Sequence, residues 1–457
     1  MPSRDSARLA PLLSAQFRKE WRELTSGYAF WAVLLLLSFL AGHSFLQAIE
    51  LYGEASRSAA RSPELAAALS PLDGIWVPTF GALYLATTFL FPFLGLRLVG
   101  GEKQTGSLKV QLQLPITPTT VTTVKGAALM AAWLATSAPF VVAVLLWRSW
   151  GGHVFLPEIG TVLLGHLLYA ATIGGIAFLL SAISESPATA GIGTLALVMA
   201  SFVLDFAGAT ATGLWKSIAA FSLTANVRVF ERGILDARLS LRFLVLAATL
   251  FLLSSIWLPT GRAIRRKVLL SAGVGLASVA VTVLVMALPP ASRDVSEDRR
   301  NSFNPADERA LREMTRPLSI TMYLAPEDSR VQEFEGNVLA KLRRTVPHLV
   351  TRYADAGNAG LHGSPDDDRY GMIVYEYDGA HDESRSTSPR EILPILHKLA
   401  RRDVAAEPVV AYPGYPLDAT AAKVPMAVFY VIIPALVLAG WRFERSRPAR
   451  IRRRLSR

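Results

Sequence analysis

The sequence contains no cysteine and no Gly-Lys dipeptide, and charged residues make up only 18% of its 457 positions. Without cysteine, the chain has no disulfide, no thiolate metal ligand and no cysteine nucleophile. Without Gly-Lys, it lacks the Gly-x-x-x-x-Gly-Lys-Ser/Thr loop that holds nucleotide phosphates. Low charge combined with 51% hydrophobic residues is typical of a membrane protein and excludes an ordinary soluble globule.

The hydrophobic residues come in blocks that are long enough to cross a bilayer. A helix rises about 1.5 Å per residue, so about 20 apolar residues span a hydrocarbon core about 30 Å thick. The segments that meet this length are 28–49, 75–99, 124–148, 154–183, 187–209, 241–260, 268–288 and 424–441. We therefore predict an α-helical polytopic membrane protein with about eight transmembrane helices. Because no small-residue cleavage site follows the first block, we expect it to remain as an anchor.

Basic residues are concentrated at the ends of alternate predicted spans. The clusters are Arg18, Lys19 and Arg22 before the first span, Lys103 and Lys109 after the second, 262–267 after the sixth, and the tail 442–457. With eight spans these clusters share one side, and the excess of Lys and Arg in cytoplasmic loops makes both termini cytoplasmic. The net charge of +11 is expected to attract anionic lipid there. No nucleic-acid partner is expected, because basic tails beside membrane helices usually set topology.

The loop 210–240 does not fit this charge pattern. It is external in the predicted topology, yet it carries Lys216, Arg228, Arg232 and Arg238. We therefore expect part of it to dip back as short amphipathic helices or to pack against protein.

The segment 291–423, between the last two predicted spans, has the composition of a folded soluble domain. Asn304-Pro305 and Ser388-Pro389 are typical helix starts, and apolar residues recur at helical spacing over 331–346. Short strands are predicted at 318–324, 372–375 and 409–411, and loops at 355–369 and 378–388. Strands that alternate with helices predict a small α/β domain, which the topology makes extracytoplasmic.

A charged segment marked by glycine and proline, 97–125, separates the second and third predicted spans. It contains Gly101-Glu102-Lys103-Gln104-Thr105-Gly106-Ser107-Leu108 and Leu114-Pro115-Ile116. Residues 108–114 alternate in polarity, which favours a strand. An isolated strand at a membrane surface leaves its backbone groups unpaired, so we expect a short helix instead. Glu102 and Lys103 either pair with charges on a partner or belong to a solvated loop that sets topology.

These motifs, together with Phe17-Arg18-Lys19-Glu20-Trp21-Arg22-Glu23, resemble the permease subunits of ABC-2 type transporters. The similarity covers about 10–262 and is closest to the six-helix gliding-motility and copper-maturation permeases. Residues 294–303 and 317–324 resemble the periplasmic domain of the gliding-motility auxiliary subunit. The chain therefore looks like a fusion of the two, with a shortened periplasmic domain.

The resemblance implies a division of the chain and a location in the bacterial inner membrane. Its parts are a cytoplasmic segment 1–27 with an interfacial elbow helix at Arg18, Lys19, Glu20 and Trp21, a six-helix permease domain 28–262, a seventh span 263–290, the periplasmic domain 291–423, an eighth span 424–441, and a basic cytoplasmic tail 442–457.

The resemblance also implies a region that contacts a separate ATPase. Its residues are Glu102, Lys103, Thr105, Gly106, Ser107, Pro115, Ser184 and Glu185. The chain is then not an enzyme and holds no cofactor or metal, and ATP and Mg bind to the ATPase, which is expected in two copies. A second permease copy in a homodimer, or a related permease, is expected because one set of six helices lacks a partner wall.

Catalytic and metal-binding patterns are scarce. The seven histidines show no metal-ligand spacing, and His362 near 366–368 is better explained by an acidic loop. Inside predicted spans, a charge at mid-depth costs about 2.5–3.5 kcal/mol. Arg97 and Asp205 are candidates for lining a transport path, or they reach the membrane surface from span ends. His43 and His166 are expected to hydrogen-bond with neighbouring helices.

Three functions remain open. The first is an ABC exporter permease for an amphiphile, polysaccharide or drug. The second is a mechanotransmitter that relays ATPase-driven motion through the last two spans to 291–423 and a periplasmic protein, without transport. The third, a membrane enzyme or ion-coupled carrier that acts alone, is disfavoured because the sequence offers no buried acidic residues or catalytic clusters.

Overall fold

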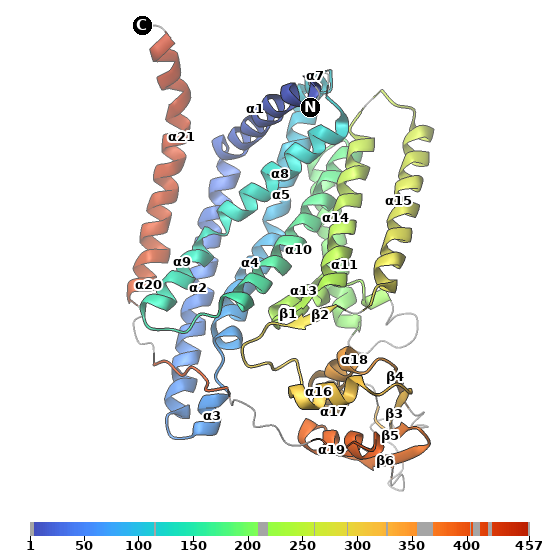
Figure 1. Cartoon of the computed structure of the whole chain (residues 1–457). Helices are drawn as coiled ribbons and strands as arrows, with labels where there is room; N and C mark the ends of the chain where they lie inside the picture. The colour runs from blue at the N-terminus through green and yellow to red at the C-terminus, as the bar shows by residue number, and fades with distance from the viewer. Residues whose placement is uncertain are drawn as a thin grey trace.

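The computed structural model describes residues 4–113, 116–208, 218–259, 261–289, 291–325, 328–353, 369–402, 404, 412–418 and 423–455. Within these residues, eight helical stretches are long and apolar enough to cross a membrane, which confirms the predicted polytopic helical fold (Figure 1). They are Tyr28–Ala59, Leu72–Thr105, Pro118–Ser149, Leu156–Ile183, Pro187–Phe206, Ala237–Trp257, Ile264–Ala287 and Lys423–Ser446.

Several spans are built from more than one helical segment. The elements are α2 (Tyr28–Ala59); the π-helical turn η1 (Leu72–Trp76), α4 (Val77–Phe89), α5 (Phe91–Leu96), the π-helical turn η2 (Arg97–Gly101) and α6 (Glu102–Thr105); α8 (Pro118–Thr136) and α9 (Ala138–Ser149); α10 (Leu156–Ile183); α11 (Pro187–Gly208); α14 (Ala237–Trp257); α15 (Ile264–Ala287); and α20 (Lys423–Ala427), η4 (Val428–Ile432) and α21 (Ile433–Leu455). Pro92 and Pro139 lie in the first turn of α5 and α9, because proline lacks the N–H that would continue the preceding helix.

The bundle has two different ends (Figure 1). Helix α1 (Arg4–Ser26), the short helix α7 (Ser107–Gln111) and both chain termini lie at one end, which we call the elbow end. The small sheet domain and α3 (Pro63–Ala67) lie at the opposite end, which we call the domain end. The elbow end also carries the junction between α14 and α15, so the basic clusters predicted to share one side do share it.

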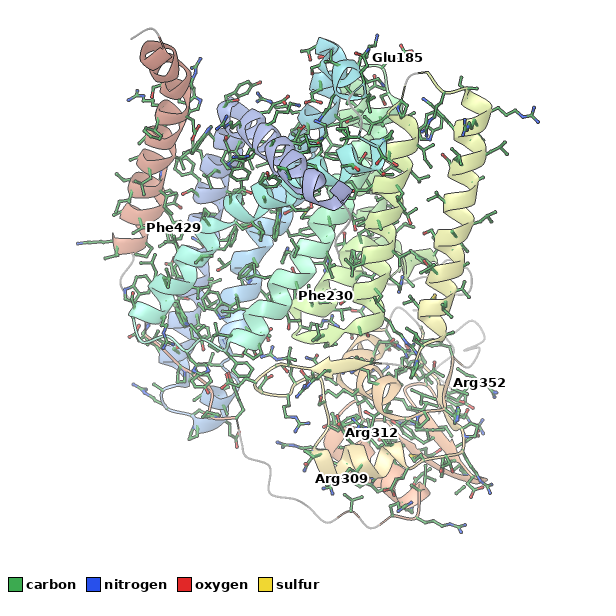
Figure 2. All side chains as sticks on the ribbon, turned by 45° about the horizontal axis from the view of Figure 1, so that its top comes forward. Glu185, Phe230, Arg309, Arg312, Arg352 and Phe429 are labelled. Carbon is green, nitrogen blue, oxygen red and sulfur yellow. The ribbon has the colours of Figure 1, made fainter. Side chains whose placement is uncertain are left out.

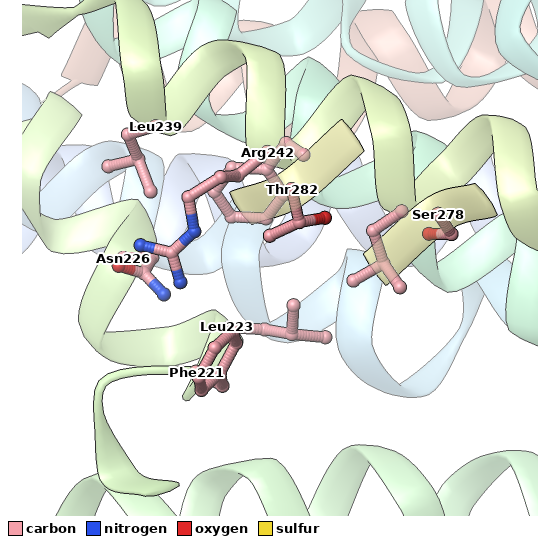
Figure 3. A pocket seen from close by; sticks show the side chains of 9 residues that line it. Phe221, Leu223, Asn226, Leu239, Arg242, Ser278 and Thr282 are labelled. Atoms are coloured by element: carbon pink, nitrogen blue, oxygen red, sulfur yellow. The ribbon is translucent and has the colours of Figure 1, made fainter. Parts of the chain in front are cut away.

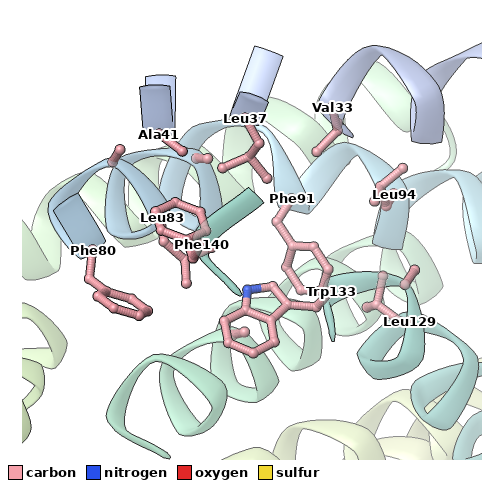
Figure 4. Packing of buried hydrophobic residues seen from close by; sticks show 14 of the residues in the cluster. Val33, Leu37, Ala41, Phe80, Leu83, Phe91, Leu94, Leu129, Trp133 and Phe140 are labelled. Atoms are coloured by element: carbon pink, nitrogen blue, oxygen red, sulfur yellow. The ribbon is translucent and has the colours of Figure 1, made fainter. Parts of the chain in front are cut away.

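Large apolar side chains fill the centre of the bundle (Figure 4). Phe80 and Phe91 from the second span meet Trp133 and Phe140 from the third, and all are buried. The ring of Phe80 stacks on Phe140 with centroids 5.3 Å apart. The indole N–H of Trp133 donates to Thr87 Oγ1 at 3.0 Å, which satisfies a polar group that lipid or protein interior would otherwise leave unpaired.

The loop 210–240 packs back against the bundle, as predicted, in the part that the structure describes. Helix α13 (Leu223–Glu231) buries Val227 and Phe230, and Gly165 of α10 allows the Phe230 side chain to approach its backbone closely. Arg228 on the other face pairs with Asp205 at 3.0 Å. An amphipathic helix with a locally paired arginine explains how this basic loop is accommodated at the domain end.

The sheet domain confirms the predicted α/β composition. Its strands are β3 (Leu318–Met322), β4 (Leu349–Tyr353), β5 (Ile373–Tyr377) and β6 (Ala380–Ser384), in the order β4-β3-β5-β6, and its helices are α16 (Pro305–Arg312), α17 (Ser329–Phe334), η3 (Glu335–Leu339), α18 (Ala340–Thr345) and α19 (Pro389–Leu399). Strand β3 is central, parallel to β4 and antiparallel to β5. Its residues alternate between buried and half-buried, as the predicted strand at 318–324 required.

One part of the domain differs from the prediction. The segment 378–388 was expected to be a loop, but β6 lies inside it and pairs with β5. The error arises because β6 is an edge strand with charged residues, which resembles a loop in composition. The predicted strand 409–411 and most of the predicted loop 355–369 lie outside the described residues.

The linker into the sheet domain is attached to the membrane helices. Strand β2 (Ser292–Asp294) pairs with β1 (Ile234–Asp236), which directly precedes α14. Beyond β2, Glu297 binds His153 Nε2 through Oε2 at 2.7 Å, and its backbone N–H donates to Glu158 Oε1 at 2.8 Å. Arg300 forms an ion pair with Asp73 at the start of the second span.

The linker out of the domain, 412–418, is attached to the same region. Tyr415 donates its hydroxyl to Glu297 Oε1 at 2.7 Å, and its ring stacks on His153 with centroids 3.6 Å apart. Tyr52 of α2 donates to the Tyr415 carbonyl at 2.7 Å, and Arg57 pairs with Asp418 at 2.6 Å. Both linkers therefore meet at Glu297, against the domain ends of α2 and α10.

This contact has a predicted dependence on pH. The hydrogen bond to Glu297 raises the pKa of Tyr415 to about 12, above the ordinary value of about 10. Its stabilisation is complete below pH 10 and is lost as pH rises through about 12, because the folded state binds this proton more tightly. When tyrosine ionisation is followed by absorbance, we expect Tyr415→Phe to lack one group that ionises near pH 12 in the wild-type protein. A difference centred near pH 10 would contradict the contact.

Candidate functional site

The charged side chains of the elbow helix and of the segment 97–125 meet in a buried cluster. Lys125 Nζ lies 2.7 Å from Glu20 Oε2 and 2.8 Å from Glu102 Oε2. Lys125 and Glu20 are fully buried, and Glu102 is 2% exposed. Lys19 completes the cluster by contacting Glu102 and lying 3.1 Å from Glu20 Oε1. We call these four residues the elbow ion cluster.

The cluster connects four helices at the elbow end. Glu20 comes from α1, Glu102 from α6 and Lys125 from α8, while Gln111 of α7 donates to Glu20 Oε1 at 3.1 Å. Within these four residues two carboxylates and two ammonium groups balance in charge, and the half-buried Glu23 also lies 3.4 Å from Lys19 Nζ. Buried ions are tolerated when they are paired in this way. Burial lowers the pKa of Lys19, but the hydrogen bonds and negative charges of Glu102 and Glu20 together outweigh burial and raise this pKa above its ordinary value.

The backbone before Glu102 explains why this carboxylate is buried. The π-helical turn η2 precedes Glu102 directly and shifts the register of the helix. Such turns are rare in proteins but frequent at functional sites, and the described residues of this chain contain four of them. Arg97, at the start of η2, places its guanidinium against Gly27, where α1 turns into α2. A Cβ at Gly27 would displace this guanidinium, which is the flexible end of the Arg97 side chain.

Lys103 also faces the protein. Its Nζ donates to the carbonyl oxygens of Ala182 at 3.0 Å and Ser184 at 2.7 Å, at the end of α10. A cation at this position satisfies carbonyl groups that lack helical partners and complements the helix dipole. It joins the turn containing Ser184 and Glu185 to the segment 97–125, at the same end of the bundle as predicted.

The geometry corrects the interpretation of Glu102 and Lys103 as charges that contact a partner directly. Glu102 lies inside the elbow ion cluster and Lys103 is engaged with α10, so neither presents its charge outward. The exposed positions are Gln104, Thr105, Ser107, Lys109, Val110 and Glu185, which we call the elbow-end face (Figure 2 labels Glu185). Val110 is the apolar member of this face and is 65% exposed. Pro115 lies outside the described residues.

Residues 107–111 form a short helix, as predicted, and not the strand that the alternating pattern of 108–114 favoured. In this part of the described chain, the need to pair backbone N–H and C=O groups outweighs the pattern of polarity. Gly106 separates α6 from α7 with φ of +76°, a left-handed conformation that favours glycine. It lets the chain turn sharply between the buried Glu102 and the exposed Val110.

Replacing Gly106 by valine is expected to disorder this turn. A residue with a Cβ in the left-handed region costs about 1–2 kcal/mol, and the space around Gly106 is otherwise open, so the effect is one of backbone strain. We expect faster amide hydrogen exchange over 102–111. Gly101→Ala is the matched control, because Gly101 is helical and has room for a Cβ. Equal exchange in both variants would contradict the role of the left-handed turn.

The two candidates for lining a transport path lie at opposite ends of the bundle. Arg97 lies beside Gly27 at the elbow end, whereas Asp205 pairs with Arg228 at the domain end. They therefore do not form one polar site. His166 is fully buried and its Nε2 lies 3.3 Å from Glu231 Oε1, but among the described residues neither ring nitrogen makes a hydrogen bond. The predicted hydrogen bond of His166 to a neighbouring helix is therefore not found, and His43 is exposed on the bundle surface.

Sequence reasoning missed the most buried charges. Lys125 begins the third predicted span and was not counted among its ionisable residues, and buried acidic residues were thought to be absent. Glu20, Glu102 and Glu158 are all buried. The only sequence pattern that could have indicated the cluster is an unusual one, a lysine two residues into the predicted span 124–148 and next to Gly126. The carboxylates come together only in the folded chain.

A crevice of about 100 Å³ lies between α13, α14 and α15 (Figure 3). Phe221, Leu223 and Phe243 contribute apolar walls, and Arg242 and Asn226 contribute polar groups. The Arg242 guanidinium lies 5.0 Å from the centre of the Phe221 ring and donates to the Ala220 carbonyl at 3.3 Å. At about 100 Å³ the crevice is smaller than the range of about 300–1,000 Å³ that is typical of small-molecule sites.

Residues 15–289 match the family model described as ABC-2 family transporter protein. The matched stretch includes most of α1, the first seven spans and all four residues of the elbow ion cluster. It extends beyond residue 262, where the resemblance was expected to end, and so includes α15. No curated protein and no solved structure matches the chain. Because the matched stretch covers more than half of the residues, the chain belongs to the ABC-2 family of transporter proteins.

Proposed function

We propose that this chain is the permease subunit of an ABC exporter in the bacterial inner membrane. A separate ATPase, in two copies, binds ATP and Mg and docks on the elbow-end face. The elbow end is then cytoplasmic, in agreement with its excess of arginine and lysine. The observation that carries the proposal is the elbow ion cluster, which connects the exposed α7 to α1 and α8 through buried charges.

The cluster suggests how movement enters the membrane. A displacement of α7 by the ATPase moves Gln111 and Glu102, and Glu20 and Lys125 transmit it to α1 and α8. Buried ion pairs resist separation, because each freed charge would remain in a medium of low polarity. The α1 and α8 helices are thus expected to move with α7 as one unit. The transport path lies between this chain and a second copy or a related permease.

The decisive experiment places a charge on the elbow-end face. In Val110→Asp, an exposed apolar contact becomes an anion, and we expect capture of the cognate ATPase by the purified chain to fall at least tenfold, which corresponds to about 1.4 kcal/mol. ATP-driven export in vesicles should fall in parallel. Leu65→Asp is the matched control, because Leu65 is 56% exposed on α3 at the domain end. Unchanged capture in Val110→Asp, or export without ATPase, would refute the proposal.

The linkers of the sheet domain favour a second candidate, mechanotransmission without transport. Both linkers are attached to α2 and α10 through Glu297, so movement of those helices reaches the domain directly. In that case ATP binding changes the position of the domain relative to the bundle while vesicles show no flux. The two functions differ in whether flux occurs.

A further inference from the structure

A polar cavity of about 400 Å³ lies in the sheet domain near its junction with the membrane helices. Its lining comes from β2, the turn that follows it, α16 and α18. The residues are Ser292, Arg293, Asp294, Arg299, Ser302, Glu308, Arg312, Arg344 and Thr345. The volume is within the range of about 300–1,000 Å³ that is typical of small-molecule sites. Figure 2 shows Arg312 on this domain, which lies beyond the ends of the membrane helices.

The acidic residues of the cavity are already satisfied by the protein. Asp294 Oδ1 accepts from the backbone N–H and the hydroxyl of Ser296 at 3.0 and 2.5 Å. Asp294 Oδ2 accepts from the backbone N–H of Asn301 at 3.0 Å and the hydroxyl of Ser302 at 2.9 Å. Glu308 pairs with Arg312 at 3.2 Å. Arg312 neutralises Glu308, whereas the hydrogen bonds to Asp294 come from neutral groups and leave its negative charge in place. The lining holds four arginines and two carboxylates, so its formal net charge is +2.

The remaining arginines are not balanced in this way. Among the described residues, Arg293 and Arg299 make no ion pair, and both are exposed at the cavity. Arg344 is half-buried and donates only to the carbonyl of Asn301, and burial lowers its pKa even though Asp294 lies near. Arg299 has φ of +51°, and its turn is closed by the backbone hydrogen bond from Ser302 N–H at 2.9 Å. Among the residues that the structure describes, these three guanidinium groups make no ion pair, although Asp294 lies near Arg344.

We propose that this cavity binds a phosphate group through Arg293, Arg299 and Arg344. Guanidinium groups match phosphate oxygens with paired N–H donors, and several of them around one cavity favour a compact polyvalent anion. The hydroxyls of Ser292 and Thr345 are placed in the same lining and add donors.

The position of the cavity allows two sources for the phosphate. Strand β2 begins shortly after α15 ends at Ala287, and β1, its partner, directly precedes α14, so the cavity lies beside the membrane surface. A lipid headgroup can reach it from the membrane, and a soluble phosphate ester can reach it from the aqueous side. Either ligand would contact the joint between the sheet domain and the helices.

The test uses the full-length chain at fixed ionic strength. One arm titrates inorganic phosphate and glycerol 3-phosphate by calorimetry in detergent. The other measures binding to nanodiscs of phosphatidylglycerol and to nanodiscs of a neutral glycolipid without phosphate. Binding in the first arm assigns a soluble phosphate, and preference for phosphatidylglycerol without binding in the first arm assigns a lipid headgroup. Absence of binding in both arms overturns the proposal.

The variant Arg293→Gln/Arg299→Gln is expected to weaken whichever interaction is found at least tenfold. Both side chains are exposed and make no ion pair among the described residues, so the fold should be retained, and near-ultraviolet circular dichroism checks this. The control variant Arg352→Gln/Arg385→Gln removes the same charge from two exposed positions of the domain outside the cavity. Equal weakening by the control pair would show general attraction to a basic domain and would also overturn the site.

Discussion

Replacing Lys125 by methionine is expected to detach the elbow helix and abolish ATP-driven function. Lys125 is the only fully buried cation of the elbow ion cluster, and without it the buried carboxylates of Glu20 and Glu102 share only Lys19, which is 47% exposed. Breaking a buried ion pair by removing one partner costs about 3–5 kcal/mol, because the other charge stays buried without compensation. We expect a lower midpoint of thermal unfolding and loss of ATPase stimulation.

Two further variants make this prediction specific. In Lys125→Met combined with Glu20→Gln and Glu102→Gln, no uncompensated carboxylate remains, so most of the stability should return. Lys109→Met removes an exposed lysine from the elbow-end face and should change unfolding by no more than about 0.5 kcal/mol. If the triple variant were as unstable as Lys125→Met, packing around the lysine stem, and not charge balance, would explain the effect.

The same variants separate stability from coupling. If the buried charges transmit movement, the triple variant regains stability but still couples ATP hydrolysis poorly, because neutral amides hold α1, α6 and α8 together less strongly. If the cluster only stabilises the fold, the triple variant regains both. ATPase stimulation measured beside the unfolding midpoint distinguishes these outcomes.

Replacing Glu297 by alanine is expected to release the sheet domain from the membrane helices. Glu297 accepts the Tyr415 hydroxyl and binds His153, so one substitution removes contacts from both linkers. Hydrogen bonds to a charged group contribute about 1.5–3 kcal/mol each. The loss should therefore free the linkers while the domain keeps its own core of Leu318, Ile320 and Phe334.

Thiol crosslinking provides the measurement, because the natural chain has no cysteine and gives no background. Cysteines at Asp73 and Arg300, which form an ion pair in the structure, report whether the linker stays on the second span. We expect crosslinking of this pair to fall severalfold in Glu297→Ala. Glu313→Ala is the control, since Glu313 pairs with Arg402 on the domain surface at 2.7 Å. Retained crosslinking would show that β1 and β2 alone hold the linker.

The release of the domain also discriminates between the two candidate functions. An exporter whose domain is an accessory should keep ATP-driven flux in Glu297→Ala. A mechanotransmitter should keep ATP hydrolysis while the domain no longer changes position with nucleotide. Glu297→Ala thus tests both whether Glu297 holds the linkers on the membrane helices and whether that attachment is needed for function.

The sequence by itself determined the class of the molecule and the arrangement of its spans. Apolar length dictated the eight helices, because backbone groups inside a membrane must be paired within the helix. An even number of spans placed the basic clusters at one end. The alternation of apolar and polar residues predicted β3. The need to pair backbone groups predicted a helix over 107–111, and that prediction is confirmed. Each of these features depends on residues that are neighbours in the chain.

Only the tertiary structure decided which charges meet. Glu20 and Lys125 are 105 residues apart, and no periodicity in the sequence links them. Whether Glu102 faces inward depends on the register that η2 imposes, and a shift of one residue would turn it away. The meeting of both domain linkers at Glu297 likewise depends on how α2 and α10 pack. Charge pairing at a distance is fixed by helix packing, and the packing comes from contacts that the linear pattern does not specify.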